Sequence, residues 1–410
     1  MGSNQSFFNL YNHGFVRVAF AIPEVRVADP AYNAEQAGAL LEQASDQACA
    51  LVVFPELGLS AYSCEDLFHQ QPLLEGCGEA LKTLVKASQG TPTMAVVGLP
   101  LRHGDLLYNC AAVFQEGRLL GVVPKTYLPN YREYYEARHF ASGETAVGDT
   151  IELCGQHDVP FGSRLLFQAS DAPLLRVHVE ICEDLWTPVP PSSYAAMAGA
   201  TVLTNLSASN ITTGKDDYRR QLVANQSGRC MAAYVYCAAG FGESTTDLAW
   251  DGHGMIYENG TAVAESQRFA YHAQLVTAEV DLERLTQDRM RNNTFGQSVA
   301  HHRDALAGWR TVAFEARLPR DKPLLLERAY ERFPYVPSDP AQRDVRCREV
   351  YEIQVQGLVK RLQAAGLQRA VIGVSGGLDS TQALLVCARA MDVLGLPREN
   401  VLAYYMPGFG

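Results

Sequence analysis

The sequence has no apolar run of about 18 residues and no segment with the features of a signal peptide, so it predicts neither a membrane-spanning helix nor secretion. Its ten cysteines include no C-x-x-C pair, which argues against a zinc site and a disulfide framework and favours reduced thiols in the cytoplasm. Basic residues are also too few for phosphate attraction: the net charge is −11, which argues against a nucleic-acid partner.

What is present is an ordinary globular composition, with 47% hydrophobic and 19% charged residues. The chain has 410 residues, enough for two or three domains that each bury a substantial core. We therefore expect a folded multidomain protein rather than a fibrous or disordered one.

Apolar runs of strand length alternate with helical patterns over the first two thirds of the chain. The pattern predicts strands at 15–22, 51–54, 93–99, 107–114, 119–123, 174–181, 201–206 and 232–238. A hairpin is predicted over 255–263, turned at Asn259 and Gly260, because this dipeptide accepts positive φ angles. Alternating strands and helices followed by hairpins indicate a layered α/β fold with a mixed sheet.

The composition changes near the end of this region and divides the chain into four segments. We expect an N-terminal tail at 1–14, a main domain at 15–285, a linker at 286–344 and a second domain at 345–410. Five prolines and many charges between 300 and 345 favour a connector there, with a helix predicted over 345–363 and a strand over 401–405.

Three polar residues stand at the ends of predicted strands: Glu56, Lys125 and Cys182. Each alone has a structural explanation, since a cysteine beside a strand usually packs in the core and a lone lysine usually lies at the surface. Together they suit amide hydrolysis. A thiol can attack a carbonyl, a carboxylate can take and return its proton, and an ammonium group can stabilise the thiolate and the oxyanion.

With their flanking residues, these three positions resemble the nitrilase superfamily, which cleaves carbon–nitrogen bonds, over residues 15–285. The resemblance implies an α-β-β-α sandwich. It also implies that Cys182 is the nucleophile, Glu56 the general base and acid, and Lys125 the oxyanion stabiliser. Glu136 resembles an additional acid found near this trio.

A second motif lies near the C-terminus, where the strand-like run 371–374 leads into a small-residue turn and a helical pattern. The glycines let backbone N–H groups face an anion, and we expect Ser380 to cap the following helix. The motif lacks the Gly-Lys-Ser/Thr ending of a Walker A loop. It resembles the pyrophosphate loop of ATP pyrophosphatases, which implies a Rossmann-like domain and ATP contacts from Ser375, Gly376, Gly377, Leu378, Asp379 and Ser380.

A nitrilase-like domain followed by this loop resembles the family of glutamine-dependent NAD+ synthetases. The resemblance implies L-glutamine, ATP with Mg²⁺, and nicotinate adenine dinucleotide as ligands, no cofactor for the glutaminase step, and a homo-oligomer formed through the nitrilase-domain helices. It places Tyr62, Tyr131, Glu183, Ser209 and Lys215 around the glutamine. Metal ligands are not assigned within the chain. Only 30 residues follow Ser380, so the second domain is expected to be incomplete here and to form NAD+ only in a longer chain.

Two other functions stay open at this point. The chain could be a stand-alone nitrilase-type amidase acting on another amide, which would be favoured if Glu183, Ser209 and Lys215 pointed away from Cys182. It could also be a non-catalytic assembly scaffold. An intact thiol, carboxylate and ammonium constellation would count against the scaffold.

Overall fold

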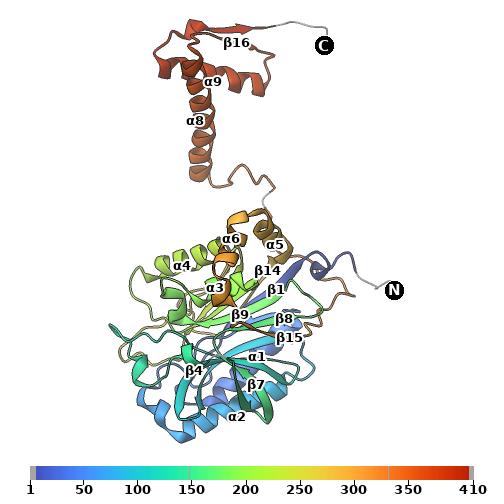
Figure 1. Ribbon diagram of the computed structural model, residues 1–410, viewed down its shortest axis with the longest axis vertical. Helices are drawn as coiled ribbons and strands as arrows, with labels where there is room; N and C mark the ends of the chain where they lie inside the picture. The colour runs from blue at the N-terminus through green and yellow to red at the C-terminus, as the bar shows by residue number, and fades with distance from the viewer. Residues whose placement is uncertain (1–5, 147, 331, 406–410) are drawn as a thin grey trace. The chain divides into compact units, whose positions relative to one another are not determined.

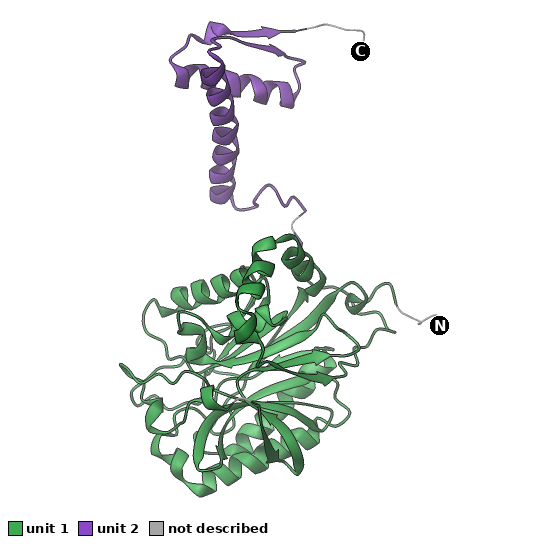
Figure 2. Cartoon of the chain, in the orientation of Figure 1, with its two compact units in different colours: residues 1–328 green, residues 329–410 purple. Residues whose placement is uncertain are grey.

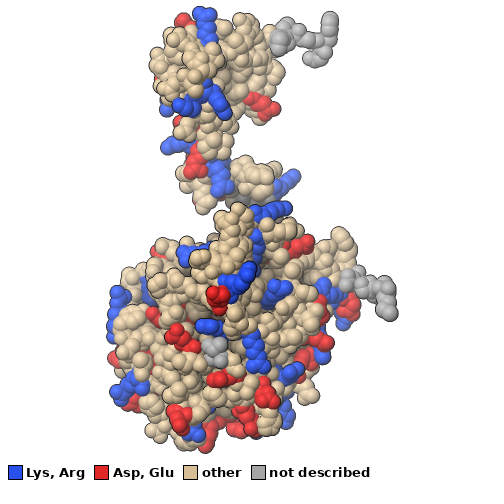
Figure 3. Space-filling model, in the orientation of Figure 1, with Lys and Arg blue, Asp and Glu red and all other residues tan. Residues whose placement is uncertain are grey.

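The computed structural model describes residues 6–146, 148–330 and 332–405, and the chain divides into two units at residues 1–328 and 329–410 (Figure 2). Among the described residues, no helix combines the length and the apolar character that a membrane crossing needs. On the face shown in Figure 3, Lys and Arg are interspersed with Asp and Glu over the first unit.

The first unit contains an eight-stranded sheet in the order β14-β1-β2-β3-β4-β5-β7-β6. Parallel pairing joins β1 to β2 and β2 to β3, while β3, β4 and β5 form an antiparallel meander. The bounds are β1 Phe15–Ile22, β2 Leu51–Val53, β3 Met94–His103, β4 Leu106–Gln115, β5 Arg118–Pro124, β6 Asp149–Leu153, β7 Gln156–Phe161 and β14 Gln274–Asp281.

A second sheet of seven strands has the order β13-β12-β11-β10-β9-β8-β15. Its central strands β9, β10 and β11 run parallel, and β12 and β13 form the hairpin predicted at Asn259 and Gly260, where φ is 47° and 82°. The bounds are β8 Leu165–Ala169, β9 Arg176–Ile181, β10 Val202–Ser207, β11 Ala233–Ala238, β12 Gly254–Glu258, β13 Thr261–Glu265 and β15 Arg310–Phe314.

The two sheets face each other across a continuous apolar core that includes Phe20, Val96, Phe167 and Val179. Helices α1 (Pro30–Asp46) and α2 (Gln71–Ala87) pack on the outer face of the first sheet. Helices α3 (Pro191–Met197) and α4 (Lys215–Cys230) cover the outer face of the second (Figure 1). This layering is the expected α-β-β-α sandwich.

The expected tail and linker contain more structure than the sequence indicated. Leu10 and Tyr11 lie in a short 3₁₀ turn and are buried in the core between the sheets. The segment expected as a linker holds α5 (Leu282–Arg291), α6 (Asn293–His301), α7 (Arg303–Leu306) and β15. Strand β15 pairs in parallel with β8, and its Phe314 lies in the same core. Burial of this side chain helps to hold the charged segment against the sandwich.

The second unit holds α8 (Pro340–Ala365), β16 (Ala370–Gly373), α9 (Leu378–Leu394) and β17 (Val401–Tyr404). Strands β16 and β17 are parallel, and α9 forms the crossover between them. This is one βαβ element, as a Rossmann-like domain requires. The expected ending of the chain at 406–410 lies outside the described residues.

Candidate active site

Glu56 lies three residues beyond the end of β2, and its side chain is wholly shielded from solvent. Its Oε1 accepts hydrogen bonds from Asn109 Nδ2 and Lys125 Nζ, each at 2.7 Å. Its Oε2 accepts the backbone N–H of Ala208, also at 2.7 Å. Donors from both sheets therefore fix the orientation of this carboxylate, which makes it suited to act as a positioned base.

Lys125 directly follows β5 and is fully buried. Besides its bond to Glu56, its Nζ donates to both carboxylate oxygens of Glu136 at 2.8 Å. Burial alone would lower the pKa of Lys125, but the Glu136 and Glu56 carboxylates outweigh it and raise that pKa well above its usual value. The ammonium group is therefore charged at neutral pH.

Glu136 lies in a 3₁₀ turn, Glu136–Arg138, and is buried beside Lys125. The Tyr62 hydroxyl donates to its Oε1 at 2.8 Å. Burial raises the pKa of Glu136 to about 7, with Lys125 opposing the shift and Glu56 adding to it. Tyr62 and Glu136, both expected near Glu56, Lys125 and Cys182, are thus in direct contact, and Glu136 also contacts Lys125.

Cys182 begins the 3₁₀ turn Cys182–Trp186 directly after β9 and has a φ of 46°, a left-handed conformation rare for residues other than glycine. Its N–H donates to Asn205 Oδ1 at 3.2 Å. Burial and the Glu56 carboxylate raise the pKa of the Cys182 thiol, while Lys125 lowers it. The thiol is therefore protonated at neutral pH. Glu56 and Lys125, the two residues expected to act on this thiol, are both close enough to influence it electrostatically.

Asp184 is a buried acid that the sequence placed beside Cys182 but to which it gave no role. Its Oδ1 accepts the Tyr127 N–H at 2.8 Å, and its Oδ2 accepts the Ile181 N–H at 2.9 Å. One carboxylate thus ties the chain just after Lys125 to the chain just before Cys182. Its place two residues after Cys182 was visible in the sequence, but the contact across the two sheets was not.

The residues expected around glutamine form two groups. In the first, the Tyr131 hydroxyl donates to Glu183 Oε1 at 2.9 Å, with Tyr131 half exposed and Glu183 half buried. Burial raises the pKa of Glu183, while the bond from Tyr131 opposes that shift. This pair offers a half-buried acid that is next to Cys182 in the sequence.

The second group lies where β10 leads to α4. Lys215 Nζ donates to Asn210 Oδ1 at 2.7 Å and lies 5.4 Å from the centre of the Trp186 ring. The Tyr134 hydroxyl donates to the same Oδ1 at 2.6 Å. Burial, followed by the charge of Arg219, lowers the pKa of Lys215, and the Cys182 thiol is close enough to influence it in the opposite direction. Sequence reasoning missed Tyr134 and Asn210, for which no motif gave a signal.

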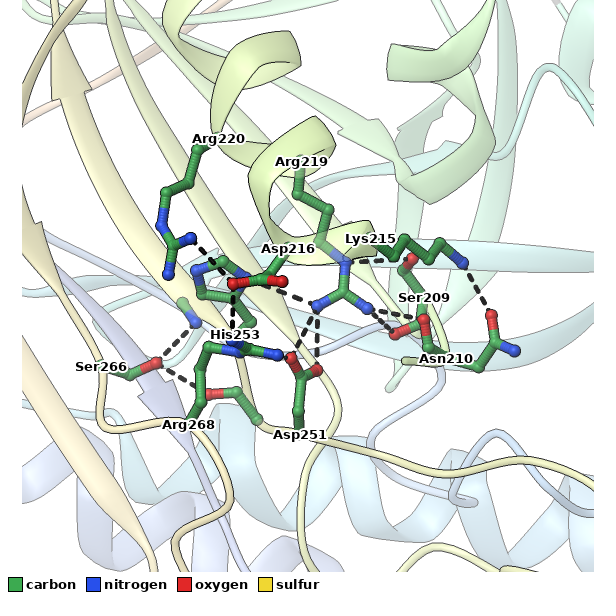
Figure 4. A network of polar contacts seen from close by, with 12 residues as sticks. Ser209, Asn210, Lys215, Asp216, Arg219, Arg220, Asp251, His253, Ser266 and Arg268 are labelled. Atoms are coloured by element: carbon green, nitrogen blue, oxygen red, sulfur yellow. Dashed lines mark hydrogen bonds and ion pairs between the residues drawn. The ribbon is translucent and has the colours of Figure 1, made fainter. Parts of the chain in front are cut away.

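Ser209 is buried and its hydroxyl oxygen accepts from Arg219 Nε at 3.3 Å (Figure 4). An open pocket lies next to Glu136. Its lining includes Tyr62, Glu133, Tyr134, Glu136 and Trp250. The pocket gives a ligand access to the side of the site formed by Tyr62 and Glu136.

One group of residues with spacing suited to a metal ion lies beside this pocket: the ligand atoms of Asp66, His69 and His139 are all within 4.8 Å of one another. Both oxygens of Asp66 already accept from the Arg138 guanidinium, at 3.0 and 3.1 Å. We assign no metal to this group, because both oxygens of its one carboxylate, which a cation would need as ligands, are already bound by Arg138.

The phosphate-loop motif lies exposed at the start of α9, with Gly376 at a φ of 87°. The expectation that Ser380 caps this helix is wrong: Gly377 is the N-cap and Ser380 lies inside the first turn. The Ser380 hydroxyl instead donates to the Gly377 carbonyl at 3.1 Å and accepts the Ser375 N–H at 3.2 Å. It closes the loop upon itself. As at the start of any α-helix, the first N–H groups of α9 have no intrahelical acceptor.

Comparison with known families gives two matches along the chain. The family model described as carbon-nitrogen hydrolase matches residues 17–290, and the one described as NAD synthase matches residues 350–409. The first match includes Glu56, Lys125 and Cys182, and the second includes the phosphate loop.

Two curated relatives extend this similarity. The chain is 50% identical to a glutamine-dependent NAD(+) synthetase of Mycobacterium bovis over 404 residues, which cover 98% of this chain and 59% of the relative. It is 29% identical to one of Aquifex aeolicus over 389 residues, covering 93% of this chain and 59% of the relative. The chain thus spans about three fifths of the length of these relatives.

Solved structures share the fold. A glutamine-dependent NAD(+) synthetase from Cytophaga hutchinsonii aligns with a TM-score of 0.58 at 22% identity, over 93% of this chain and 53% of that chain. A carbon-nitrogen hydrolase from Helicobacter pylori G27 aligns with a TM-score of 0.56 at 18% identity, over 72% of this chain and 99% of that chain. The second alignment covers nearly the whole hydrolase, so the sandwich is a complete architecture of this type.

Proposed function

This chain belongs to the carbon-nitrogen hydrolase family, and we propose that it hydrolyses the side-chain amide of L-glutamine to supply ammonia for the synthesis of NAD+. The observation that carries the proposal is the buried contact of Lys125 with Glu56 and Glu136 beside the Cys182 thiol. Its substrate side rests on the relatives named as glutamine-dependent NAD(+) synthetases.

The first step needs a base, because the buried Cys182 thiol holds its proton. Glu56 accepts this proton as the sulfur attacks the amide carbon, and the carbonyl becomes an oxyanion. Lys125, charged and already oriented by two carboxylates, stabilises the thiolate and, with a backbone N–H, the oxyanion. Glu136 holds the ammonium group in place from the other side.

The tetrahedral intermediate then collapses with loss of ammonia, which takes the proton from Glu56 as it leaves. A thioester between Cys182 and the glutamyl group remains. Water, deprotonated by Glu56, attacks this thioester, and the resulting glutamate departs as the thiol recovers its proton. One carboxylate serves both halves, which requires the fixed orientation that Asn109, Lys125 and the Ala208 N–H give it.

Recognition of glutamine rather than a simple amide requires partners for an α-amino and an α-carboxylate group. Glu183 with Tyr131 offers the acid, and Lys215 offers the cation, with Ser209 beside it. Lys215 lies within electrostatic reach of Cys182, which favours glutamine over the alternative of an amidase with no need for these groups. The scaffold alternative leaves the buried charge cluster without a purpose.

The phosphate loop suits ATP, because Gly376 adopts a positive φ angle that favours glycine and the first N–H groups of α9 are available to an anion. Residues Ser375, Gly376, Gly377, Leu378, Asp379 and Ser380 would hold the phosphates, with Mg²⁺ accompanying them. Bound ATP would supply the adenylate that activates nicotinate adenine dinucleotide for attack by ammonia.

Two further features are part of the proposal. All ten cysteines are unpaired, which fits a reducing compartment such as the cytoplasm. The similarity to the nitrilase superfamily suggests a homo-oligomer formed through the helices of the sandwich, which light scattering would test directly.

The test is the product formed from glutamine. The wild-type chain should release glutamate and ammonia, and Cys182→Ala should release neither, because its nucleophile is gone. Cys182→Ser should be nearly inactive, since an alcohol ionises far less readily than a thiol. Cys347→Ala, which changes an exposed cysteine of the second unit, is the control and should keep full activity. Glutamate release by Cys182→Ala at the wild-type rate would overturn the assignment.

A further inference from the structure

Arg219 of α4 is a charged side chain that the catalytic steps do not use, yet it is among the most deeply buried groups in the first unit. Every one of its five N–H donors has an acceptor. Nη1 donates to both oxygens of Asp251 at 2.9 Å, and Nε to Ser209 Oγ at 3.3 Å. Nη2 donates to the backbone carbonyls of Ser209 and Asn210 at 2.7 and 2.6 Å (Figure 4).

An ion pair with Asp251 does not account for this arrangement. Burying a guanidinium and a carboxylate costs desolvation that their attraction offsets only in part, so a buried pair is weak evidence for a stabilising role. Three of the five donors point instead to Ser209 and Asn210, in the loop 208–210 that follows β10. Only a planar fork reaches an acid on one side and two successive carbonyls on the other.

The same loop meets the active site through its other groups. The Ala208 N–H donates to Glu56 Oε2 at 2.7 Å, so the loop orients the base. The Asn210 N–H donates to the Tyr134 hydroxyl at 3.1 Å, and its side chain accepts from Lys215 at 2.7 Å, so the loop also fixes the cation that we propose for glutamine binding. Arg219 binds the carbonyls of the loop, while the N–H groups of the loop and the Asn210 side chain bind Glu56, Tyr134 and Lys215.

Asp251 is itself held from behind. Arg268 Nε donates to its Oδ2 at 2.9 Å, and Arg268 Nη1 donates to Asp216 at 2.5 Å (Figure 4). Asp216 lies in the first turn of α4, next to Lys215. Arg219, Asp251 and Arg268 thus connect the loop to the first turn of α4, which also carries Lys215.

We propose that Arg219 is a positioning residue for the glutaminase reaction. By holding the loop 208–210 in place, it sets the orientation of Glu56 and the position of Lys215 together. The inference rests on the proposed function, and it adds a residue that touches neither the substrate nor the nucleophile.

The main test is Arg219→Lys in the whole chain. Lysine keeps the charge that pairs with Asp251 but lacks the fork, so the protein should fold while the loop loses its clamp. We expect kcat/KM for glutamine to fall by about 100-fold, as for a misplacement of about 1 Å at a reacting centre. Both a lower kcat, from Glu56, and a higher KM, from Lys215 and Asn210, should contribute.

The matched control is Arg229→Lys on the same helix. Arg229 is exposed and donates to Asn225 at 2.7 Å, and among the contacts of the described residues it touches neither the loop nor Asp216 and Asp251. Its kcat and KM should stay within about twofold of wild type, because a surface substitution that keeps the charge and leaves the clamp intact changes little. Equal losses in the two variants, or a fall in kcat with an unchanged KM in Arg219→Lys, would overturn the proposal.

A double variant, Arg219→Met with Asp251→Leu, covers the case in which the lysine variant does not fold. It replaces the buried pair by apolar groups, which often preserves stability. A folded double variant with wild-type kinetics would also overturn the proposal, because the clamp would then be dispensable.

Alkylation of Cys182, followed by mass spectrometry, gives a readout that does not need turnover. An alkylating diazoketone analogue of glutamine should label Arg219→Lys about 100-fold more slowly than wild type, whereas iodoacetamide, which lacks the amino-acid groups, should be affected less. Equal slowing of both reagents would refute the substrate-positioning part. Failure of the proposed function would look different: the wild-type chain itself would then neither hydrolyse glutamine nor prefer the analogue.

Discussion

The ammonium group of Lys125 lies 2.7 Å from Glu56 Oε1, and both side chains are completely excluded from solvent. Opposite charges at this distance and burial orient each other strongly, so both groups are already ordered before a ligand binds. Lys125 donates to one oxygen of Glu56, and the Ala208 N–H, just after β10 of the second sheet, donates to the other. The orientation of the Glu56 carboxylate therefore depends on the relative position of the two sheets.

Asp184→Asn tests whether the two segments carrying Lys125 and Cys182 need to be tied together. An amide has one acceptor oxygen, so either the Tyr127 or the Ile181 N–H loses its partner. We expect the free energy of unfolding to fall by about 1.5–3 kcal/mol and glutaminase kcat to fall by at least about 10-fold. Urea unfolding and a glutamate assay measure the two effects.

The control for that variant is Asp171→Asn, since Asp171 also accepts two backbone N–H groups, from Ala316 and Arg317 at 2.7 and 2.8 Å, but is exposed and belongs to no part of the site. It should leave kcat unchanged. A similar loss of kcat in both variants would mean that the tie at Asp184 has no special place in the reaction.

Tyr131→Phe removes the hydroxyl that holds Glu183. Because the expected partner of that acid is the α-amino group of glutamine, binding should suffer more than chemistry. We expect KM for glutamine to rise roughly 10-fold, the value of one hydrogen bond to a charged group, with kcat within about twofold. Steady-state kinetics separate the two, and Tyr127→Phe, whose exposed ring makes its polar contact to Asp184 only through the backbone, is the control. A fall in kcat with KM unchanged would contradict the assigned role.

Glu136→Gln makes a prediction about pH. Burial raises the pKa of Glu136 from 4.5 to about 7, so between these values the folded state holds a proton that the unfolded state releases. The free energy of unfolding of the wild type should therefore decrease through this group as pH rises from about 4.5 to 7, and the variant should lack this component. Urea unfolding at several pH values would show the variant gaining stability relative to wild type as pH rises. The opposite slope would show that ion pairing with Lys125 outweighs burial.

Gly376→Ala addresses the phosphate loop. At a φ of 87°, an alanine costs roughly 1–2 kcal/mol of backbone strain, although no atom lies within 4 Å of its added carbon. Relief of this strain would move the N–H groups of the loop, so ATP binding measured by calorimetry should weaken. Gly395→Ala suffers the same kind of strain, at a φ of 66° in the same unit and also with open space around it, and should bind ATP as wild type does. Equal affinities of Gly376→Ala and wild type would argue against a nucleotide at this loop.

Much of the sandwich was predictable because central strands such as β11 are short runs of hydrophobic residues, and all six residues of β11 are buried. Strands β6 and β7 were missed because only three of their eleven residues are buried, so they carry no such run. Strand β15 was missed because it lies in a charged segment with prolines nearby, and only Phe314 of its residues is fully buried.

The site shows the same limit in another form. Glu56, Lys125 and Cys182 stand at strand ends with recognisable neighbours, which is why the sequence could bring them together. Arg219 carries no such signal: its acceptors lie 9, 10 and 32 residues away, on a loop and on a segment beyond β11. Contacts of this kind are decided by the packing of separate elements, which periodicity does not encode.

The groups to which we assign the reaction are shared between the two sheets: Glu56 and Lys125 follow β2 and β5 of one, and Cys182 follows β9 of the other, where Ala208, which orients Glu56, follows β10. The rate of turnover should consequently depend strongly on how the two sheets are aligned. A small slip of one layer across the other would separate acid from thiol while leaving every helix and strand intact. Enzymatic activity should thus disappear at lower denaturant concentrations than circular dichroism does, and core substitutions far from Cys182, at the interface of the layers, should slow the reaction before they unfold the protein.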